Sequence, residues 1–157
     1  MLITIGAFDG FHKGHWELLR LCRENSTGSN WGVVTFYPHP SEFIGSIKRT
    51  LFTLQEKELI RNVLDIPNMY VLKFDDELMR LSPQKFWSFL HKKLNVDGIV
   101  MGSDFHFGFA RTGNAESLRE MALSDGVNRI VIADLVKKPE YSSSNIRENI
   151  IAGNVKR

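Results

Sequence analysis

Residues 6–15 read Gly-Ala-Phe-Asp-Gly-Phe-His-Lys-Gly-His and lie between an apolar segment, residues 2–5, and an amphipathic segment, residues 16–24. An apolar, β-branched run without alternation is typical of a strand buried on both faces, as in a parallel sheet. The amphipathic segment predicts a helix, so the stretch between them is a turn from strand to helix. Its three glycines let the backbone bend sharply and come close to a ligand.

Two histidines, His12 and His15, stand where this helix should begin. The first N–H groups of a helix have no partner within the helix, and with the positive end of the helix dipole they attract phosphate. We therefore interpret the turn as a phosphate-binding loop. A turn that only packs a helix on a sheet would explain the glycines but not the paired histidines. Zinc is a lesser hypothesis, because it needs a third ligand and the lone Cys22 lies within the apolar helix pattern.

Length and composition fit one domain with a core of its own, since the chain has 157 residues and is 43% hydrophobic. The formal charge of +2 is too small to indicate a nucleic-acid-binding surface, although it suits a phosphate-rich small ligand. The chain shows neither a signal peptide nor an apolar stretch long enough for a membrane span, and one cysteine forms no internal disulfide. We expect a cytoplasmic protein without membrane partners, whose oligomeric state the sequence leaves open.

Strand and helix patterns alternate along the rest of the chain. Further buried strands are predicted over residues 31–36, 69–74, 97–101 and 129–132. Helices are predicted to begin at three capping residues: Thr53, Ser82 and Asn114. The segment 41–51 has no clear period, so we expect a mobile crossing there. The alternation predicts an α/β fold, a Rossmann-like parallel sheet with helices on both faces.

Loops at the carboxyl ends of strands are where parallel α/β sheets bind ligands. Pro38-His39-Pro40 follows the second strand, and its prolines make a rigid, extended exit. A stiff loop with a solvent-facing histidine is the alternative. Asp104, Phe105 and Phe107 follow the fourth strand, where aromatic rings suit a flat ring system. On periodicity alone, one face of a strand is the better explanation of these phenylalanines.

Ser142, Ser143 and Ser144 precede Arg147 and an apolar-periodic run that ends at Gly153. One serine suffices to cap a helix here, which leaves two hydroxyls to explain. A helix start with free hydroxyls and amides, and an arginine one turn later, forms a second phosphate-binding group. We therefore expect the two helix starts, at the histidines and at the serines, to face a common triphosphate.

In order and spacing these segments resemble the nucleotidylyltransferase superfamily, in which a His-x-Gly-His turn and a later Ser-Ser-x-x-x-Arg segment hold a nucleoside triphosphate. Within it, the chain is similar to the FMN adenylyltransferase (FAD synthetase) module of bacterial bifunctional riboflavin kinase/FMN adenylyltransferases. The narrower resemblance rests on the segments Thr-Phe-Tyr-Pro-His-Pro at 35–40 and Gly-Ser-Asp-Phe-His-Phe-Gly at 102–108. It covers nearly the whole chain and implies the fold of this superfamily.

The resemblance implies an enzyme of FAD biosynthesis that transfers AMP from ATP to FMN and gives FAD and pyrophosphate, with Mg²⁺ held mainly through the ATP phosphates. The catalytic residues that it implies are His12, His15 and Arg147. The ATP-binding residues that it implies are Gly6, Phe8, Asp9, Gly10, His12, Gly14, His15, Ser142, Ser143, Ser144 and Arg147. The flavin-binding residues that it implies are Pro38, His39, Pro40, Asp104, Phe105 and Phe107.

Two features depart from the family pattern. Position 7 is usually asparagine and is Ala7 here, which removes one hydrogen bond to a ligand. The riboflavin kinase half of the family would follow residues 153–155, and this chain stops at Arg157, so we expect one FMN adenylyltransferase-like domain over residues 1–157 with the kinase domain absent. Three alternatives stay open: transfer to another phosphate acceptor, flavin and ATP binding without turnover, and a purely structural α/β domain.

Overall fold

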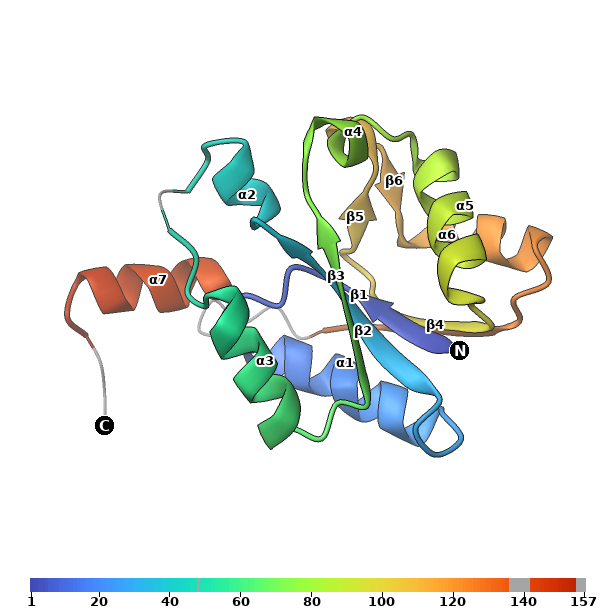
Figure 1. Ribbon diagram of the computed structural model, residues 1–157, viewed down its shortest axis with the longest axis horizontal. Helices are drawn as coiled ribbons and strands as arrows, with labels where there is room; N and C mark the ends of the chain where they lie inside the picture. Colours follow the sequence, from blue (N-terminus) through green and yellow to red (C-terminus); the bar gives the residue numbers. More distant parts are fainter. Residues whose placement is uncertain (48, 136–141, 155–157) are drawn as a thin grey trace.

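The computed structural model describes residues 1–47, 49–135 and 142–154. Five parallel strands form its main sheet, in the order β3-β2-β1-β4-β7 (Figure 1). In chain order these strands are β1 (Leu2–Ile5), β2 (Trp31–Tyr37), β3 (Asn68–Lys73), β4 (Gly98–Gly102) and β7 (Arg129–Ala133). Each corresponds to one of the apolar runs, and the prediction of a Rossmann-like parallel sheet is confirmed.

The chain winds from β1 outward to β3 on one side of the sheet and from β4 to β7 on the other. β1 and β4 lie side by side, with Leu2 opposite Gly98, so the direction of winding reverses between them. At such a point the loops that follow the strands diverge and leave a crevice beyond the carboxyl ends. The glycine-rich turn follows β1, and the fold therefore places it at this crevice.

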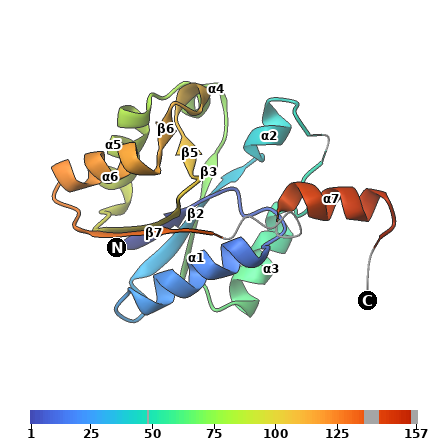
Figure 2. The ribbon, with the colours of Figure 1, turned by 180° about the vertical axis from the view of Figure 1, so that it is seen from behind.

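Helices cover both faces of the sheet (Figures 1 and 2). On one face lie α1 (Lys13–Glu24) and α3 (Leu54–Val63), and on the other lie α5 (Pro83–Leu94) and α6 (Ala115–Ser124). Successive strand residues point to opposite faces, so Ile3 packs in the cluster with α5 and α6 while Leu2 packs in the cluster with α1. Both faces of the sheet are thus apolar, which explains strands that read as continuous apolar runs.

The predicted helix starts are confirmed by their caps. Thr53 and Glu56 form a capping box at α3. The Ser82 hydroxyl accepts a hydrogen bond from the Lys85 N–H at 3.3 Å, and the Asn114 side chain accepts one from the Ser117 N–H at 2.9 Å. The last helix, α7 (Ser143–Ile151), begins after Ser142, whose hydroxyl accepts from the Asn145 N–H at 3.1 Å. Side-chain caps of this kind satisfy N–H groups that the helix itself leaves unpaired.

Two short helices occupy loops in which the sequence shows no helical period. The predicted mobile crossing begins instead with α2 (Pro40–Phe43), because the His39 Nδ1 atom accepts a hydrogen bond from the Ser41 N–H at 3.0 Å and caps the turn. An acidic loop contains α4 (Asp76–Met79), capped by the Asp75 carboxylate. A single turn of helix needs only a local cap, which periodicity does not reveal.

The loop after β4 folds on itself. It forms a small antiparallel pair, β5 (His106–Phe107) and β6 (Gly113–Asn114), joined by the 3₁₀ turn η1 (Phe109–Arg111).

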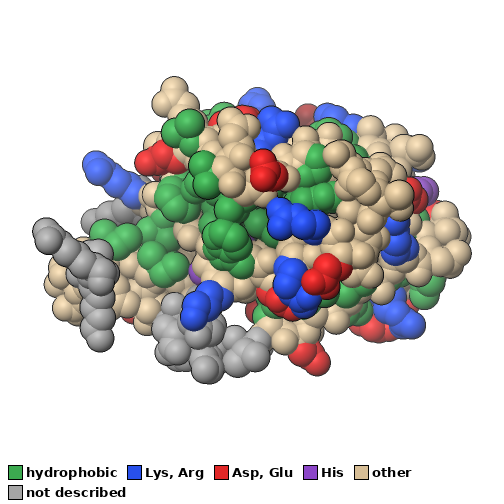
Figure 3. Space-filling model, turned by 90° about the horizontal axis from the view of Figure 1, so that it is seen from below, with side chains coloured by type: hydrophobic (Ala, Val, Ile, Leu, Met, Phe, Trp, Pro, Cys, Tyr) green, Lys and Arg blue, Asp and Glu red, His purple; other side chains and the backbone are tan. Residues whose placement is uncertain are grey.

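On the opposite side of the molecule, α3 leaves Leu59 and Val63 exposed, and Figure 3 shows apolar side chains among charged ones on the surface seen from below. Across the described parts of the chain, no helix has the length and apolar character that crossing a membrane requires.

Candidate active site

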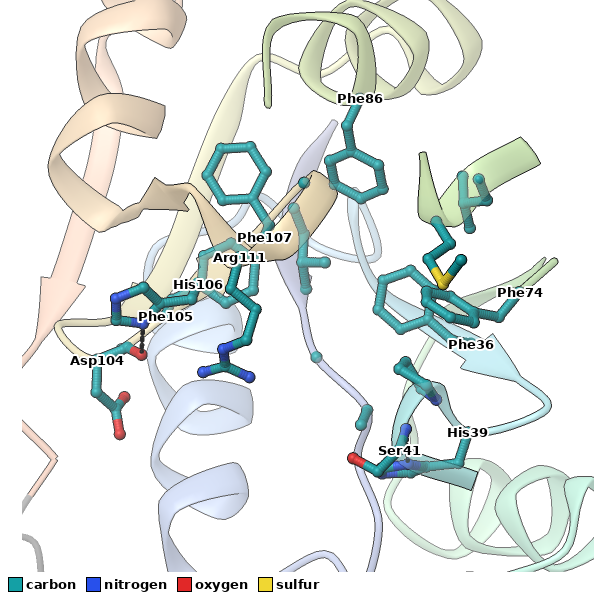
Figure 4. A pocket seen from close by; sticks show the side chains of 18 of the residues that line it. Phe36, His39, Ser41, Phe74, Phe86, Asp104, Phe105, His106, Phe107 and Arg111 are labelled. Carbon is teal, nitrogen blue, oxygen red and sulfur yellow. Dashed lines mark hydrogen bonds between the residues drawn. The ribbon is translucent and has the colours of Figure 1, made fainter. Parts of the chain in front are cut away.

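A cavity of about 750 Å³ lies at the carboxyl ends of the strands, where the loops after β1, β2 and β4 meet. It is bounded by the glycine-rich turn, the start of α1, α2 and the β5–β6 loop, and Figure 4 shows its aromatic side. Eight of the predicted site residues line it: Gly6, His12, His15, His39, Pro40, Asp104, Phe105 and Phe107. The fold thus brings residues predicted to bind phosphate and residues predicted to bind the flavin to the wall of the same cavity.

The two histidines of the turn form a stacked pair. Their ring centroids are 3.8 Å apart at an interplanar angle of 21°, because His12 is the residue before α1 and His15 lies three positions later, on the same side of the helix. The His15 ring also packs on Phe8, at 4.7 Å between centroids. The Nδ1 atoms of both histidines are buried and have no hydrogen-bond partner within the described residues. Unpaired buried polar atoms beside a cavity are suited to a polar ligand.

Both rings are held neutral by their surroundings. Burial is the main cause that lowers the pKa of His15 to about 3, and the neighbouring His12 and the Lys57 ammonium lower it further. Burial also lowers the pKa of His12, although the carboxylates of Asp104 and Asp9 oppose this effect. Two stacked imidazoles cannot both carry a proton without strong repulsion. At neutral pH the pair therefore offers uncharged N–H donors.

The lowered pKa of His15 predicts a loss of stability in acid. The unfolded chain takes up a proton near the ordinary histidine pKa of 6.5, whereas the folded chain does so only near pH 3. The free energy of unfolding should therefore be fully present above about pH 6.5 and fall toward pH 3, with His15 contributing up to about 1.4 kcal/mol per pH unit. Urea unfolding at several pH values should show a shallower fall for His15→Gln than for the wild type. Equal slopes would contradict the assignment.

A buried lysine supports the turn from below, and sequence reasoning missed it. Lys57 of α3 is 3% exposed, and its Nζ atom donates to the Ala7 carbonyl at 2.7 Å. The Thr35 hydroxyl donates to the same carbonyl at 3.0 Å. A lysine on an amphipathic helix is ordinarily solvent-exposed, so nothing in the pattern singled it out. The two donors fix the backbone of the turn at the floor of the cavity.

Asp9 lies behind the turn rather than in the cavity wall. Its side chain is 1% exposed, and its Oδ1 atom accepts from the N–H groups of Leu51 at 2.8 Å and Phe52 at 3.1 Å. Its Oδ2 atom is 2.8 Å from Arg147 Nη2. The Ser143 hydroxyl donates to the Asp9 carbonyl. One buried carboxylate thus joins the turn, the segment before α3 and the start of α7.

These contacts join the glycine-rich turn to the start of α7 through Asp9. Arg147 also donates from Nε to the Arg49 carbonyl at 3.2 Å. Within the described residues, several predicted ATP-binding or flavin-binding residues lie outside the wall of the cavity: Phe8, Asp9, Gly10, Gly14, Pro38, Ser142, Ser143, Ser144 and Arg147. Phe8 is fully buried beneath His15, and Gly10 has a φ of 85° that a side chain would strain. Ser144 and Arg147 line a second cavity, of about 690 Å³, between residues 46–51 and α7.

The flavin side of the cavity is built of aromatic rings (Figure 4). Phe105 and Phe107 are stacked, with centroids 5.5 Å apart and an interplanar angle of 10°. Phe74, which the sequence did not indicate, stands opposite them and contacts Phe36 at 5.9 Å between centroids. Phe107 also belongs to the core, so the strand interpretation of the phenylalanines is right for this residue. Flat aromatic faces on two sides of a cavity suit a planar ligand.

Few of the described residues around this cavity could bind a metal ion. Among residues 1–47, 49–135 and 142–154, no group of three histidines, cysteines or acidic residues has the arrangement of a metal site. Asp75, in the acidic loop, caps α4 and pairs with Lys73 at 3.2 Å. Cys22 belongs to α1 and is buried in the core, and burial raises its pKa to about 12. The structure brings no third ligand to the histidine pair within these ranges.

Comparisons with known proteins show the family to which the chain belongs. Two bifunctional riboflavin kinase/FMN adenylyltransferases are similar to the chain. That of Buchnera aphidicola subsp. Schizaphis graminum is 32% identical over 160 residues, 98% of this chain and 51% of the relative. That of Listeria monocytogenes serovar 1/2a is 31% identical over 159 residues, 97% of this chain and 50% of the relative. The chain thus spans about half the length of the curated relatives it matches.

A solved structure shares the fold. The crystal structure of a macrolide-efflux protein from Streptococcus pneumoniae has a TM-score of 0.82 and 28% sequence identity to the chain, and covers 99% of this chain and 52% of that one. The family described as FAD synthetase matches residues 1–146, which include the histidine turn, the aromatic loops and most of the serine segment. The chain therefore belongs to the FAD synthetase family.

Proposed function

We propose that residues 1–157 act as an FMN adenylyltransferase domain, which transfers AMP from ATP to FMN and releases FAD and pyrophosphate. The observation that carries the proposal is the stacked pair of His12 and His15, with unpartnered Nδ1 atoms, in the same cavity as the aromatic rings of Phe105 and Phe107. One end of this cavity suits phosphate and the other suits a planar ring. Membership of the FAD synthetase family supports the same substrates.

No protein nucleophile is needed for this reaction. A phosphate oxygen of FMN attacks the α-phosphorus of ATP, the new P–O bond of FAD forms, and the bond to the β-phosphate breaks so that pyrophosphate leaves with the electron pair. The protein positions the two phosphates and stabilises charge as it moves. His12 and His15, neutral because burial lowers the pKa of each, donate N–H groups to the non-bridging oxygens.

The start of α7 is proposed to hold the β and γ end of ATP. Arg147 uses Nε and Nη2 for the Arg49 carbonyl and the Asp9 carboxylate, and its other N–H groups have no partner within the described residues. A guanidinium has five N–H donors, so the remaining ones are available to phosphate while the first two fix its position. Ser142, Ser143 and Ser144 stand at the same helix start, where the dipole favours an anion.

Mg²⁺ fits this site as part of the nucleotide. The described residues hold no set of protein ligands for a resident ion, and Asp104 is the single carboxylate in the cavity wall. In nucleotide sites Mg²⁺ usually takes phosphate oxygens as ligands, together with one or two carboxylates from the protein. When bound, the ion would neutralise part of the charge on the phosphates. Asp104 is the residue that we propose to face it.

Chromatography of flavin products tests the proposal. The pure chain is incubated with Mg²⁺, ATP and either FMN or riboflavin, and we expect FAD and pyrophosphate from FMN and no new flavin from riboflavin. Parallel reactions with CTP, and with pantetheine phosphate or nicotinamide mononucleotide as acceptor, should give no product. Product from one of these acceptors but not from FMN would replace the proposed substrate. Tight binding of ATP and FMN in calorimetry without pyrophosphate release would identify a binding module instead.

A further inference from the structure

The cavity wall contains one permanently charged cation, and neither the family resemblance nor the sequence patterns give it a role. Arg111 stands at the end of η1, and Figure 4 shows its guanidinium directed into the cavity, between Asp104 and His106 on one side and His39 on the other. The other lining residues include no lysine or arginine within the described residues. Burial lowers the pKa of His12, His15 and His39, so these three are weak sources of positive charge at neutral pH.

The guanidinium is exposed and unpaired. No hydrogen bond or ion pair of the Arg111 side chain to another described residue is present, in contrast to Arg147, which is held by Asp9. A guanidinium offers a planar set of five donors that match the oxygens of a phosphate. An arginine with these donors facing an apolar cavity is placed to meet an anion that enters with the ligand.

The backbone of η1 is strained at Ala110 and Arg111, the residues whose conformation directs the Arg111 side chain. Ala110 and Arg111 have φ values of 53° and 57°, in the left-handed region that disfavours residues with a Cβ atom. Neighbouring contacts hold the turn in this form: the Phe109 N–H donates to the Leu81 carbonyl at 2.7 Å, and the Arg111 N–H donates to the Gly108 carbonyl at 3.0 Å. Strain of this kind persists where the surroundings enforce it, and it concentrates at ligand sites.

The same turn is anchored on the flavin side of the cavity. Gly108 has a φ of 74° and packs so closely on Pro83, at the start of α5, that an added Cβ atom would lie 2.8 Å from it. Phe107, one residue earlier, packs on Phe86 of the same helix at 5.7 Å between centroids. The backbone of Arg111 is therefore held beside the aromatic wall of the cavity. The residues proposed to hold the β and γ end of ATP belong to α7 instead.

We propose that Arg111 binds the phosphate of the acceptor, FMN, and so selects a phosphorylated flavin over riboflavin. The inference rests on the proposed function, because it assigns one more residue to the same site. FMN is a planar ring joined by a flexible chain to a phosphate dianion, and the cavity holds aromatic rings and one guanidinium on the same loop. Riboflavin has the ring without the phosphate and gains nothing from the cation.

Direct binding separates this role from a structural one. The variants are Arg111→Gln, Arg111→Lys and Arg111→Gly, with Arg119→Gln as the control, since Arg119 lies on the exposed side of α6 and pairs with Glu116 at 2.9 Å. Glycine tolerates a φ of 57° and removes only the side chain, so Arg111→Gly keeps the turn without the guanidinium. Dissociation constants of FMN and riboflavin are measured by quenching of flavin fluorescence, and the KM values of FMN and ATP are measured by FAD formation.

We expect Arg111→Gly and Arg111→Gln to weaken FMN binding about 10- to 100-fold, as the loss of charge-assisted hydrogen bonds does. Arg111→Lys should lie between these variants and the wild type, and Arg119→Gln should match the wild type. Riboflavin binding and the KM of ATP should stay within about twofold. Unchanged FMN binding would overturn the assignment, as would an equal loss for riboflavin or a rise confined to the KM of ATP. A wild-type chain that binds no FMN would instead contradict the proposed function itself.

Discussion

Replacing His15 with alanine should lower the turnover number for FAD formation about 10²- to 10³-fold, the usual effect of removing one donor from a site that stabilises developing negative charge. The His15 ring is stacked on His12 and packed on Phe8, so its orientation is set before substrate binds. In the proposed mechanism, the His15 N–H stabilises mainly the charge that develops on the α-phosphate in the transition state. The KM values of ATP and FMN should therefore change much less than the turnover number.

A matched histidine elsewhere serves as the control for this prediction. His91 of α5 stacks on Trp87 at 5.1 Å between centroids and does not line the cavity, so His91→Ala should leave turnover within about twofold. Initial rates at saturating ATP and FMN give the comparison, and thermal unfolding verifies that both variants are folded. Near-normal turnover in His15→Ala would remove the histidine pair from the mechanism.

The second large effect concerns the buried carboxylate behind the turn. Asp9→Ala should lower the free energy of unfolding by about 3 kcal/mol, since removing one partner of a buried ion pair leaves the other without compensation. The Arg147 guanidinium and the N–H groups of Leu51 and Phe52 would all lose their acceptor. Urea unfolding at neutral pH measures the loss. ATP binding should weaken as well, because Arg147 is no longer held at the start of α7.

A double-mutant cycle measures the interaction free energy between Asp9 and Arg147. Arg147→Met removes the guanidinium but leaves two backbone donors on the Asp9 carboxylate, so its stability loss should be smaller than that of Asp9→Ala. The loss in the double variant should be less than the sum of the two single losses, because the residues are in contact. Additive losses would show that the two side chains do not stabilise each other.

The elements that local patterns control could be predicted from the sequence. Apolar runs identify all five parallel strands, and capping residues identify the starts of α3, α5 and α6. The turn with His12 and His15 is predictable for the same reason, since a glycine-rich strand-to-helix turn is a local feature. The turn also carried part of the family resemblance, which the comparisons confirm.

Side-chain burial depends on tertiary packing and was harder to predict. In α5, Trp87 is 2% exposed whereas Phe89 is 36% exposed, although an aromatic residue at either position fits the helix. The indole Nε1 of Trp87 donates to the Asp125 carboxylate at 2.7 Å, a partner 38 residues away that no local pattern contains. Lys57 is buried for a comparable reason, because its partner is the Ala7 carbonyl on a distant loop.

The geometry shows where the predicted site residues lie, and their roles stay predictions. His12, His15, His39, Asp104, Phe105 and Phe107 lie together in one cavity wall. Asp9 is engaged with Arg147 and two backbone N–H groups, so a role in positioning Arg147 fits its contacts better than direct contact with ATP. Sequence alone cannot separate these roles, because both require a carboxylate in the turn. The ATP-binding roles of the serine segment and Arg147 stay predictions.

The position of the transferred phosphorus tests the central claim most directly. The pure chain is incubated with Mg²⁺, FMN and ATP carrying a ³²P label at the α-phosphate, and the flavin, nucleotide and pyrophosphate products are separated and counted. Attack at the α-phosphorus predicts that the label appears in FAD, in equal amount to the FAD formed, with unlabelled pyrophosphate. Label left in AMP or ADP while the flavin product is unlabelled, or FMN left unchanged while ATP stays intact, would contradict adenylyl transfer by this site.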